Sequence, residues 1–293
     1  MAEFKGLSQY CAPRNYELGG KSFHLVMDDG EETLLHFLDG ENVEIAGKGE
    51  PFVWECYEAL KADETTYFVH IQPAKSGDLK HYVAILDTAQ RLVTTVTVEE
   101  AFDPEHPRLM KVVPAFGAIK VPGHALPEIR HHLSDKMAGE HVVWHYNPGF
   151  GIQHIYHTPF CVRASNPPGT VRREEEIPQW YKDRQKWYPF YEEPCFHIWI
   201  NDHLNLFSFV EENMTLRSPG FSEGGGGMIV LQDTGRLIDM GLCFNPANLR
   251  YSDTYLLTAY GEANQIEDPL DTAESPYDWS GFQCMPCHRW GMP

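Results

Sequence analysis

Short runs of alternating apolar and polar residues, each closed by a turn sequence, recur along most of this chain. Alternation with a period of two places every second side chain on the same face of a β-strand. The run Ser22–Met27 ends at Asp28–Gly30, and the run Glu32–Leu38 ends at Asp39-Gly40. Both endings are typical of tight turns. Because the connections are so short, the sequence predicts a mainly β fold in which successive strands pair antiparallel.

The same texture continues through both halves of the chain, and its segments are rich in Val, Ile, Thr and aromatic residues, which favour strands. In the first half, further strands are expected at Phe52–Leu60, Thr66–Gln72, His81–Leu86 and Arg91–Val98. In the second half, strands are expected at His141–Tyr146, Gln153–Val162, Cys195–Asp202, Asn205–Glu211, Met228–Leu231, Arg236–Phe244 and Thr254–Gly261.

One short sequence in the first half is echoed in the second. Ile85–Val93 and Val230–Ile238 both place Asp-Thr in the turn of a hairpin, at Asp87 and Asp233, and Arg-Leu at the start of the returning strand. The spacing from Asp to Arg differs by one residue between them. An echo half a chain apart predicts a duplication, with two related barrel-like halves. The alternative is that Asp-Thr hairpins simply recur in a β-rich chain.

This reading divides the chain into an N-terminal barrel (1–100), a linker (101–139), a C-terminal barrel (140–262) and a C-terminal tail (263–293). In the linker, helical spacing predicts a short helix over Pro127–Met137. Its apolar face would hold Leu126, Ile129, Leu133 and Met137. A weaker helix is expected at Pro178–Trp187, inside an insertion (166–194) that is either a lid or a surface excursion.

The charge balance restricts the partners. Against 42 Asp and Glu the chain has 23 Lys and Arg, a net charge of -19, which repels phosphate backbones and anionic lipids. We therefore expect no nucleic-acid partner and no membrane partner. The first residues show no secretory pattern, and no apolar segment reaches the ~18–20 residues of a membrane helix. A cytoplasmic protein is expected, and a homodimer is compatible with the sequence.

Seven cysteines are present, an odd number that favours free thiols over a disulfide framework in a chain without a secretion signal. Near the C-terminus, Cys284-Met-Pro-Cys287-His288 has the spacing of a haem c attachment motif. Haem attachment needs export, a zinc site would need a fourth ligand, and a redox pair would need a strand before it and a helix after it. We expect incidental thiols, with a metal site or a redox pair as alternatives.

Several of these segments resemble the MoaF-like family, named for molybdenum cofactor biosynthesis protein F. Those that resemble its N-terminal domain are Gly19–Gly30, Trp54–Ala59, Tyr67–His70 and Val83–Asp87. Those that resemble its C-terminal domain are Val142–Tyr156, Leu206–Glu211 and Met228–Phe244.

The resemblance covers about residues 18–100 and 140–262 and implies two calycin-like, or lipocalin-like, antiparallel barrels in tandem. Similar small barrels include cofactor-free phenolic acid decarboxylases and other lyases, hydratases and cyclases. The resemblance therefore implies a pocket for a small metabolite.

Strand alternation selects the candidate catalytic residues, which are Glu211, His154, Tyr156 and His145. Glu211 shares a strand face with two phenylalanines, and desolvation would raise its pKa and suit it to act as an acid. His154 is the candidate base, and Tyr156 and His145 would orient the substrate. The alternatives are a solvated Glu211 and a structural His154.

Metal binding by one strand is not expected. His154 and His157 point to opposite faces, and His141 and His145 would lie ~13 Å apart at strand rise. We therefore expect neither a metal nor a cofactor.

Two functions fit these residues. The first is a cofactor-independent enzyme of lyase or isomerase type, acting on a small aromatic or carbonyl-containing metabolite in a barrel pocket. The second is a non-catalytic binding protein of lipocalin type.

Overall fold

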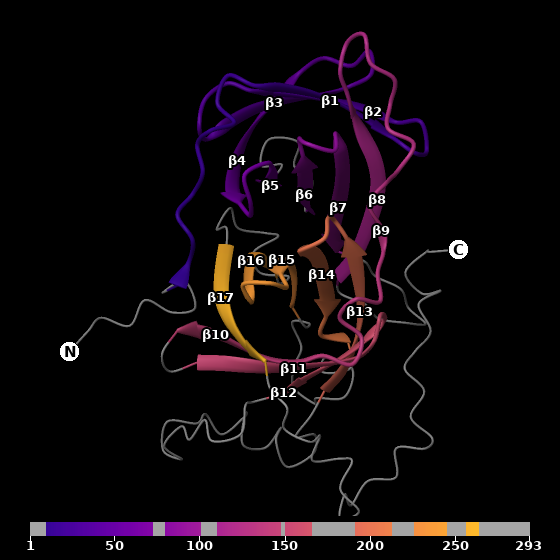
Figure 1. The fold of residues 1–293 in the computed structure, drawn as a ribbon. Helices are drawn as coiled ribbons and strands as arrows, with labels where there is room; N and C mark the ends of the chain where they lie inside the picture. Colours follow the sequence, from indigo (N-terminus) through magenta and orange to yellow (C-terminus); the bar gives the residue numbers. More distant parts are fainter. Residues whose placement is uncertain are drawn as a thin grey trace, which may run out of the picture.

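The computed structural model describes residues 10–72, 80–100, 110–147, 150–165, 191–212, 226–244 and 256–263. These residues fold into two closed antiparallel barrels of eight strands each, which confirms the predicted fold class. Figure 1 shows the first barrel, in indigo to magenta, above the second, which continues to yellow. Among the described residues there is no helix with the length and apolar character needed to span a membrane.

The first barrel is an uninterrupted meander in which each strand pairs with the next and β8 closes on β1. Its strands are β1 (Ser22–Met27), β2 (Glu32–Phe37), β3 (Asn42–Gly47), β4 (Val53–Lys61), β5 (Thr66–Gln72), β6 (Lys80–Asp87), β7 (Leu92–Glu100) and β8 (Met110–Lys120). At Gly117 a Cβ would lie 2.6 Å from the backbone oxygen of Val26, so only glycine allows β8 to approach β1 this closely.

The second barrel repeats this meander from β10 to β17. It closes through the pairing of β17 with β10, and the short β9 extends its sheet beside β13. Its strands are β9 (His132–Leu133), β10 (His141–Asn147), β11 (Phe150–Thr158), β12 (Cys161–Ser165), β13 (Tyr191–Trp199), β14 (Leu204–Val210), β15 (Gly227–Asp233), β16 (Ile238–Phe244) and β17 (Leu256–Ala263).

The two barrels also share one strand register, which is the structural counterpart of the sequence echo. When β1 to β8 are matched in order with β10 to β17, residues that pair in one barrel correspond to residues that pair in the other. Corresponding pairs include Phe37–Val43 and Tyr156–Val162, Val43–Glu55 and Val162–Glu193, and Val69–Ala84 and Phe207–Val230. This agreement all the way round a barrel favours duplication over two unrelated β halves.

The echoed hairpins turn out to have equal lengths. Asp87 pairs with Leu92 and Asp233 with Ile238, so Arg91 corresponds to Leu237. Both of these residues adopt positive φ, 58° and 51°, which is uncommon outside glycine. The two arginines of the echo are therefore not equivalent, because Arg236 lies one position earlier in its turn.

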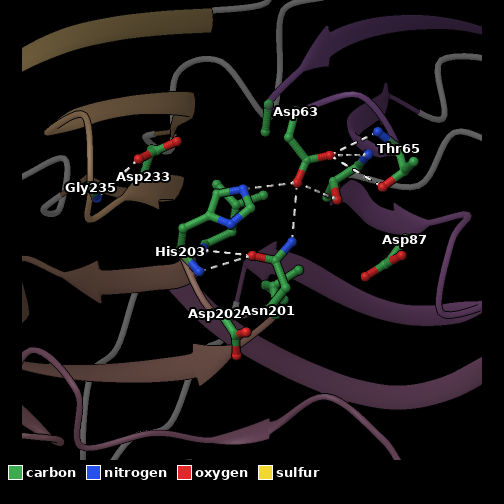
Figure 2. Close-up of polar contacts among 12 residues, drawn as sticks. Asp63, Thr65, Asp87, Asn201, Asp202, His203, Asp233 and Gly235 are labelled. Atoms are coloured by element: carbon green, nitrogen blue, oxygen red, sulfur yellow. Dashed lines mark hydrogen bonds and ion pairs between the residues drawn. The ribbon is translucent and has the colours of Figure 1, made fainter.

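Corresponding turns of the two barrels meet at their junction. Asp63 accepts hydrogen bonds from the backbone N–H groups of Thr65 and Thr66 in its own turn, while Asn201 caps the matching turn of the second barrel. Asn201 Nδ2 donates to Asp63 Oδ2 at 3.1 Å, and His203 Nε2 lies 3.3 Å from the same oxygen. Figure 2 shows these contacts.

The echoed hairpins add a reciprocal pair of contacts across this junction. Gln90, in the turn between β6 and β7, donates to the backbone oxygen of Ile200 at 3.2 Å. Arg236, in the turn between β15 and β16, donates to the backbone oxygen of Ala62 at 2.7 Å. In each barrel, the turn of the echoed hairpin therefore donates a hydrogen bond to the backbone of the other barrel.

A shared apolar core separates the two barrel interiors. It packs outward-facing side chains of the first barrel, such as Phe68 and Ile85, against those of the second, such as Phe196, Leu206 and Leu231. Every residue of β14 and β15 is buried for this reason, since one face of each strand lies inside its barrel and the other faces the first barrel. Each barrel also has an interior cluster of its own.

The predicted helix over Pro127–Met137 is wrong. The segment has no helix in the structure, and Ile129 is 56% exposed. The residue that it buries most deeply is His131, which lies off the predicted apolar face and is 2.8 Å from the Thr94 hydroxyl. Leu133 instead pairs with Ile198. An apolar periodicity forms a helix only when its face finds a surface to pack against.

Most predicted strands are present, with three differences. The expected strand Gln153–Val162 is two strands, β11 and β12, joined by a turn at Pro159 and Phe160. The strands β3 and β8 were not predicted. β8 lies in the segment 101–139 that the sequence assigned to the linker, so the first barrel extends to Lys120.

Four predicted features fall wholly or mostly on residues that are not described. The helix at Pro178–Trp187, the C-terminal tail after residue 263, and the tail's Cys284 and Cys287 lie outside the described residues. So does the insertion as far as residue 190, after which β13 begins.

Candidate functional site

The interior of the second barrel is the candidate functional site. Alternation on its strands directs one side chain in two inward, and those side chains form an aromatic cluster that includes Trp144, Tyr156 and Phe207. Within the same interior lie several buried polar residues: His154, His197, Asn205, Gln232 and Asp239. Polar groups in such an interior need hydrogen-bond partners.

A hydrogen-bond network centres on the Tyr156 hydroxyl. Trp144 Nε1 donates to this oxygen at 3.0 Å, and Gln232 Nε2 donates to it at 2.7 Å. His154 Nδ1 lies 3.3 Å from the same oxygen. Because the two donors occupy both acceptor positions of the hydroxyl, its own proton is donated to His154 Nδ1. His154 therefore carries its proton on Nε2.

The network continues to a second histidine. Asn205 Nδ2 has two hydrogens and donates one to Gln232 Oε1 at 3.2 Å and the other to His197 Nδ1 at 2.9 Å. His197 therefore also carries its proton on Nε2. Burial lowers the pKa of both His154 and His197 to about 3, so both imidazoles are neutral near pH 7.

Asp239 supplies a third group to the interior from β16. Its Oδ1 accepts a hydrogen bond from the backbone N–H of Ala259 at 2.9 Å. Burial nevertheless raises the pKa of this carboxyl well above its usual value. The neutral acid is therefore the favoured form, and its second oxygen carries the proton.

Four atoms of these residues are fully buried and have no hydrogen-bond partner in the structure: His154 Nε2, His197 Nε2, Asn205 Oδ1 and Asp239 Oδ2. Leaving a buried polar group unpaired costs about 1–3 kcal/mol. Three of the four are donors according to the proton positions derived above, and one is an acceptor. These groups therefore have hydrogen-bonding capacity that the residues of the second barrel do not use.

The first barrel shows that this polarity is not needed to build the fold. The equivalents of His154, Tyr156, His197, Gln232 and Asp239 are Leu35, Phe37, Ala59, Leu86 and Val93. All five belong to the apolar interior cluster of the first barrel. At these positions the barrel interior is therefore apolar in one copy and polar in the other. We call this part of each interior the base of the barrel.

Three of the four residues selected from the sequence lie in or beside this interior. His154 and Tyr156 are fully buried and in contact, as their alternation predicts. Glu211 follows the end of β14 and is half-buried, and its Oε2 accepts a hydrogen bond from the backbone N–H of Gly226 at 3.2 Å. Burial, and secondarily the charge of Glu211, raises the pKa of Cys243, whose side chain packs on the interior cluster.

His145 lies elsewhere. Its neighbours Trp144 and Tyr146 point inward, so alternation turns His145 to the outer surface, where its side chain is 42% exposed and 3.4 Å from the Glu262 carboxylate. The expectation that His145 orients a substrate in the pocket is therefore wrong, because it has the outward parity on β10.

Sequence reasoning missed His197, Asn205, Gln232 and Asp239. Each is a polar residue at an inward position of a strand that is otherwise largely apolar, so alternation could have found them. Comparing these residues with their first-barrel equivalents requires an alignment of the two halves of the chain. The echo obscures that alignment, because its two arginines are offset by one position.

The structure also bears on metal binding and on the state of the cysteines. Within the described part of the chain, no group of three or more His, Cys, Asp or Glu side chains is arranged to hold a metal ion. The described cysteines, Cys11, Cys56, Cys161, Cys195 and Cys243, are not joined in disulfides, as predicted.

Comparison with known protein families matches residues 1–100 to the family described as MoaF N-terminal domain. The second barrel lies outside the matched residues. Comparison with curated proteins finds no match.

Proposed function

We propose, from the match of residues 1–100 to the family described as MoaF N-terminal domain and from the interior of the second barrel, that the protein binds a small carbonyl-containing metabolite in that interior and transfers a proton on it. The family and the barrel folds themselves suggest small-molecule binding. The polar interior of the second barrel supports the narrower proposal.

The ligand class follows from the donors. His154 Nε2, His197 Nε2 and Asp239 Oδ2 each present a hydrogen in a dry interior. Neutral imidazoles and a protonated carboxyl are suited to polarise a carbonyl and to stabilise the oxyanion that forms when an adjacent carbon loses a proton. The surrounding rings, including Phe207 and Phe209 at 5.5 Å from the His154 ring, suit an aromatic or otherwise flat substrate.

The proposed proton acceptor is Glu211, which lies beside Gly226 at the other end of β15 from Gln232 and Asp239, so the substrate must extend along the barrel interior between the donors and this carboxyl group. His154 is the base in the sequence-based scheme, but its Nδ1 already accepts the Tyr156 proton and burial holds its pKa at about 3. Glu211 Oε2 accepts a hydrogen bond from the backbone N–H of Gly226, which fixes the position of this carboxyl group at the end of β14. The roles of acid and base are therefore exchanged relative to that scheme.

The single observation that carries this proposal is the set of four buried atoms without partners. Three of them, on His154, His197 and Asp239, lie at positions where the sister barrel has the apolar side chains of Leu35, Ala59 and Val93. A protein that only carried a ligand could use the same donors. The two functions differ in one outcome: an enzyme changes its ligand chemically, and a carrier releases it unchanged.

Deuterium exchange distinguishes these outcomes. Phenylacetone, a neutral aromatic ketone, is incubated with the full chain in D2O, and the loss of its α-hydrogen signals is followed by NMR. We expect accelerated exchange, and we expect Glu211→Gln to slow it by about 10²–10⁴-fold while binding persists. Removal of a donor by Asp239→Val is expected to slow exchange by about 10²–10³-fold.

The matched control is Glu262→Gln, which removes an exposed carboxylate beside His145 on the outer surface. It should exchange phenylacetone at the unmodified rate. Binding of phenylacetone without any exchange would leave the carrier function. Neither binding nor exchange, together with no small molecule retained in native mass spectra of the purified protein, would refute the site.

A further inference from the structure

One buried carboxylate occurs at the same place in both barrels. Glu55 on β4 and Glu193 on β13 correspond in register, because Val43 pairs with the first and Val162 with the second. Both point into their own barrel and are almost completely buried, 3% and 1% exposed. Buried carboxylates are rare, and their occurrence in both copies makes this position a shared feature.

In the first barrel, Glu55 lines a pocket of about 380 Å³. This pocket lies at the end of the barrel that holds the turn between β3 and β4, which we call the open end. The pocket also holds Lys80 and Tyr82 on β6, with Ile45 and Val53 as apolar walls. Its volume lies in the range of about 300–1,000 Å³ typical of small-molecule sites. All of its lining residues fall within the part of the chain that matches the family.

The strand register places Glu55 and Lys80 opposite each other across this pocket. Tyr57 pairs with Ile71, which pairs with Tyr82, so Tyr57 and Tyr82 stand in one row of side chains. Two residues further toward the open end, Glu55 and Lys80 share the next row. Their strands are separated only by β5, which puts their backbones about 10 Å apart.

The two barrels differ around the shared glutamate. Lys80 corresponds to Gly226, and Tyr82 to Met228, so the second barrel lacks both the cation and the hydroxyl. The first barrel is thus polar at its open end and apolar at its base, where Leu35 and Phe37 lie. The second barrel keeps Glu193 at the equivalent position but has its other buried polar groups at the base. The two interiors are therefore built for different ligands.

We propose that the open end of the first barrel is a second binding site, for a small amino acid-like molecule that carries both an ammonium and a carboxylate group. Glu55 binds the ammonium and Lys80 the carboxylate, as charge-assisted hydrogen bonds. The Tyr82 hydroxyl offers a further polar contact, and Ile45 and Val53 cover the apolar side chain of the ligand. A site with one charge of each sign favours a zwitterion over a simple amine or a simple acid.

Calorimetric titration of the full chain tests this with L-leucine and L-phenylalanine as probes. We expect at least one of them to bind, and its deaminated and decarboxylated counterparts (4-methylpentanoate and 3-methylbutylamine, or 3-phenylpropanoate and 2-phenylethylamine) to bind at least about tenfold more weakly. Glu55→Gln and Lys80→Met are each expected to weaken binding of the zwitterion by about tenfold or more.

Two controls separate this site from others. Glu41→Gln changes an exposed carboxylate in the turn between β2 and β3, outside the pocket lining, and should leave affinity within about twofold. Glu193→Gln changes the equivalent carboxylate in the second barrel and should also leave it unchanged, so failure here is distinct from failure of the proton-transfer site. Lys80 is only half-buried, so Lys80→Met remains informative if Glu55→Gln does not fold.

The proposal is overturned if neither amino acid binds, if the amine or the acid binds as well as the zwitterion, or if Glu55→Gln and Lys80→Met both bind normally. Equal loss on Glu193→Gln would place the ligand in the second barrel instead.

Discussion

At the scale of single residues, three buried histidines make the protein sensitive to acid. Burial lowers the pKa of His131, His154 and His197 to about 3, from 6.5 when exposed. Between these two pH values the unfolded chain binds protons that the folded chain does not. The free energy of unfolding therefore falls as the pH falls below 6.5, by up to about 1.4 kcal/mol per pH unit for each histidine.

Asp239 acts in the opposite direction. Its pKa is raised in the folded state from 3.8, so above that pH the folded chain holds a proton that the unfolded chain has lost. Asp239 therefore destabilises the fold as the pH rises and offsets part of the contribution of the histidines.

We predict that His154→Leu, the residue of the sister barrel, reduces the acid sensitivity. Urea titrations at several pH values between 4 and 6 should show a slope smaller by about 1.4 kcal/mol per pH unit than that of the parent chain. His145→Leu is the control, because His145 is exposed. An unchanged slope in His154→Leu would mean that His154 is protonated in the folded protein.

The sequence predicts this interior only in part. Alternation correctly places His154 with Tyr156, because a strand's period holds wherever the strand is regular. Alternation alone does not say which of a strand's two faces points inward. For this reason it predicts a pocket role for His145 that is wrong. The inward face depends on the neighbouring strands, and for β10 it is decided by Trp144 and Tyr146.

At the scale of elements, two capped turns join the barrels. Asn201 Oδ1 accepts hydrogen bonds from the backbone N–H groups of His203 and Leu204, and its Nδ2 donates to Asp63 of the first barrel. One side chain thus fixes a turn and a contact between barrels. Side chains that cap backbone N–H groups in this way typically contribute about 1 kcal/mol.

Asn201→Ala is therefore expected to lower the free energy of unfolding by about 1–3 kcal/mol, because two backbone groups and Asp63 lose a partner. The measurement is equilibrium unfolding in urea. Asp202→Ala, an exposed position in the same turn, should change stability by less than about 0.5 kcal/mol. Equal effects of the two substitutions would show that the junction contact does not stabilise the fold.

Element prediction succeeded where alternation and turn residues agree, and failed where they conflict. β1 and β5 have the predicted bounds, Ser22–Met27 and Thr66–Gln72. β8 contains Pro114 and Gly117, residues that usually mark the end of a strand, and it was taken for linker. The predicted helix at Pro127–Met137 had local periodicity alone, and the packing of His131 and Leu133 against other strands outweighed it.

At the scale of the whole molecule, the two barrels share a core, and we predict that they unfold as one unit. Side chains of β5 and β6, such as Phe68 and Ile85, pack with Phe196 and Leu206 of the second barrel. Separating the barrels would expose this apolar surface to water, which is unfavourable by roughly 25 cal/mol for each Å². Neither barrel can therefore unfold without uncovering the face of the other.

Leu206→Ala tests this coupling, because it creates a cavity between the barrels. A large-to-small change in a core costs about 2–5 kcal/mol, and here the cost should lower the stability of both barrels together. Hydrogen exchange measured by mass spectrometry should show faster global exchange in peptides from β4 to β7 as well as from β13 to β16, and calorimetry should show one transition. Ile129→Ala, at a 56% exposed position, is the control. If protection in the first barrel were unchanged while that of the second fell, the barrels would be independent domains, since a shared core transmits the loss to both.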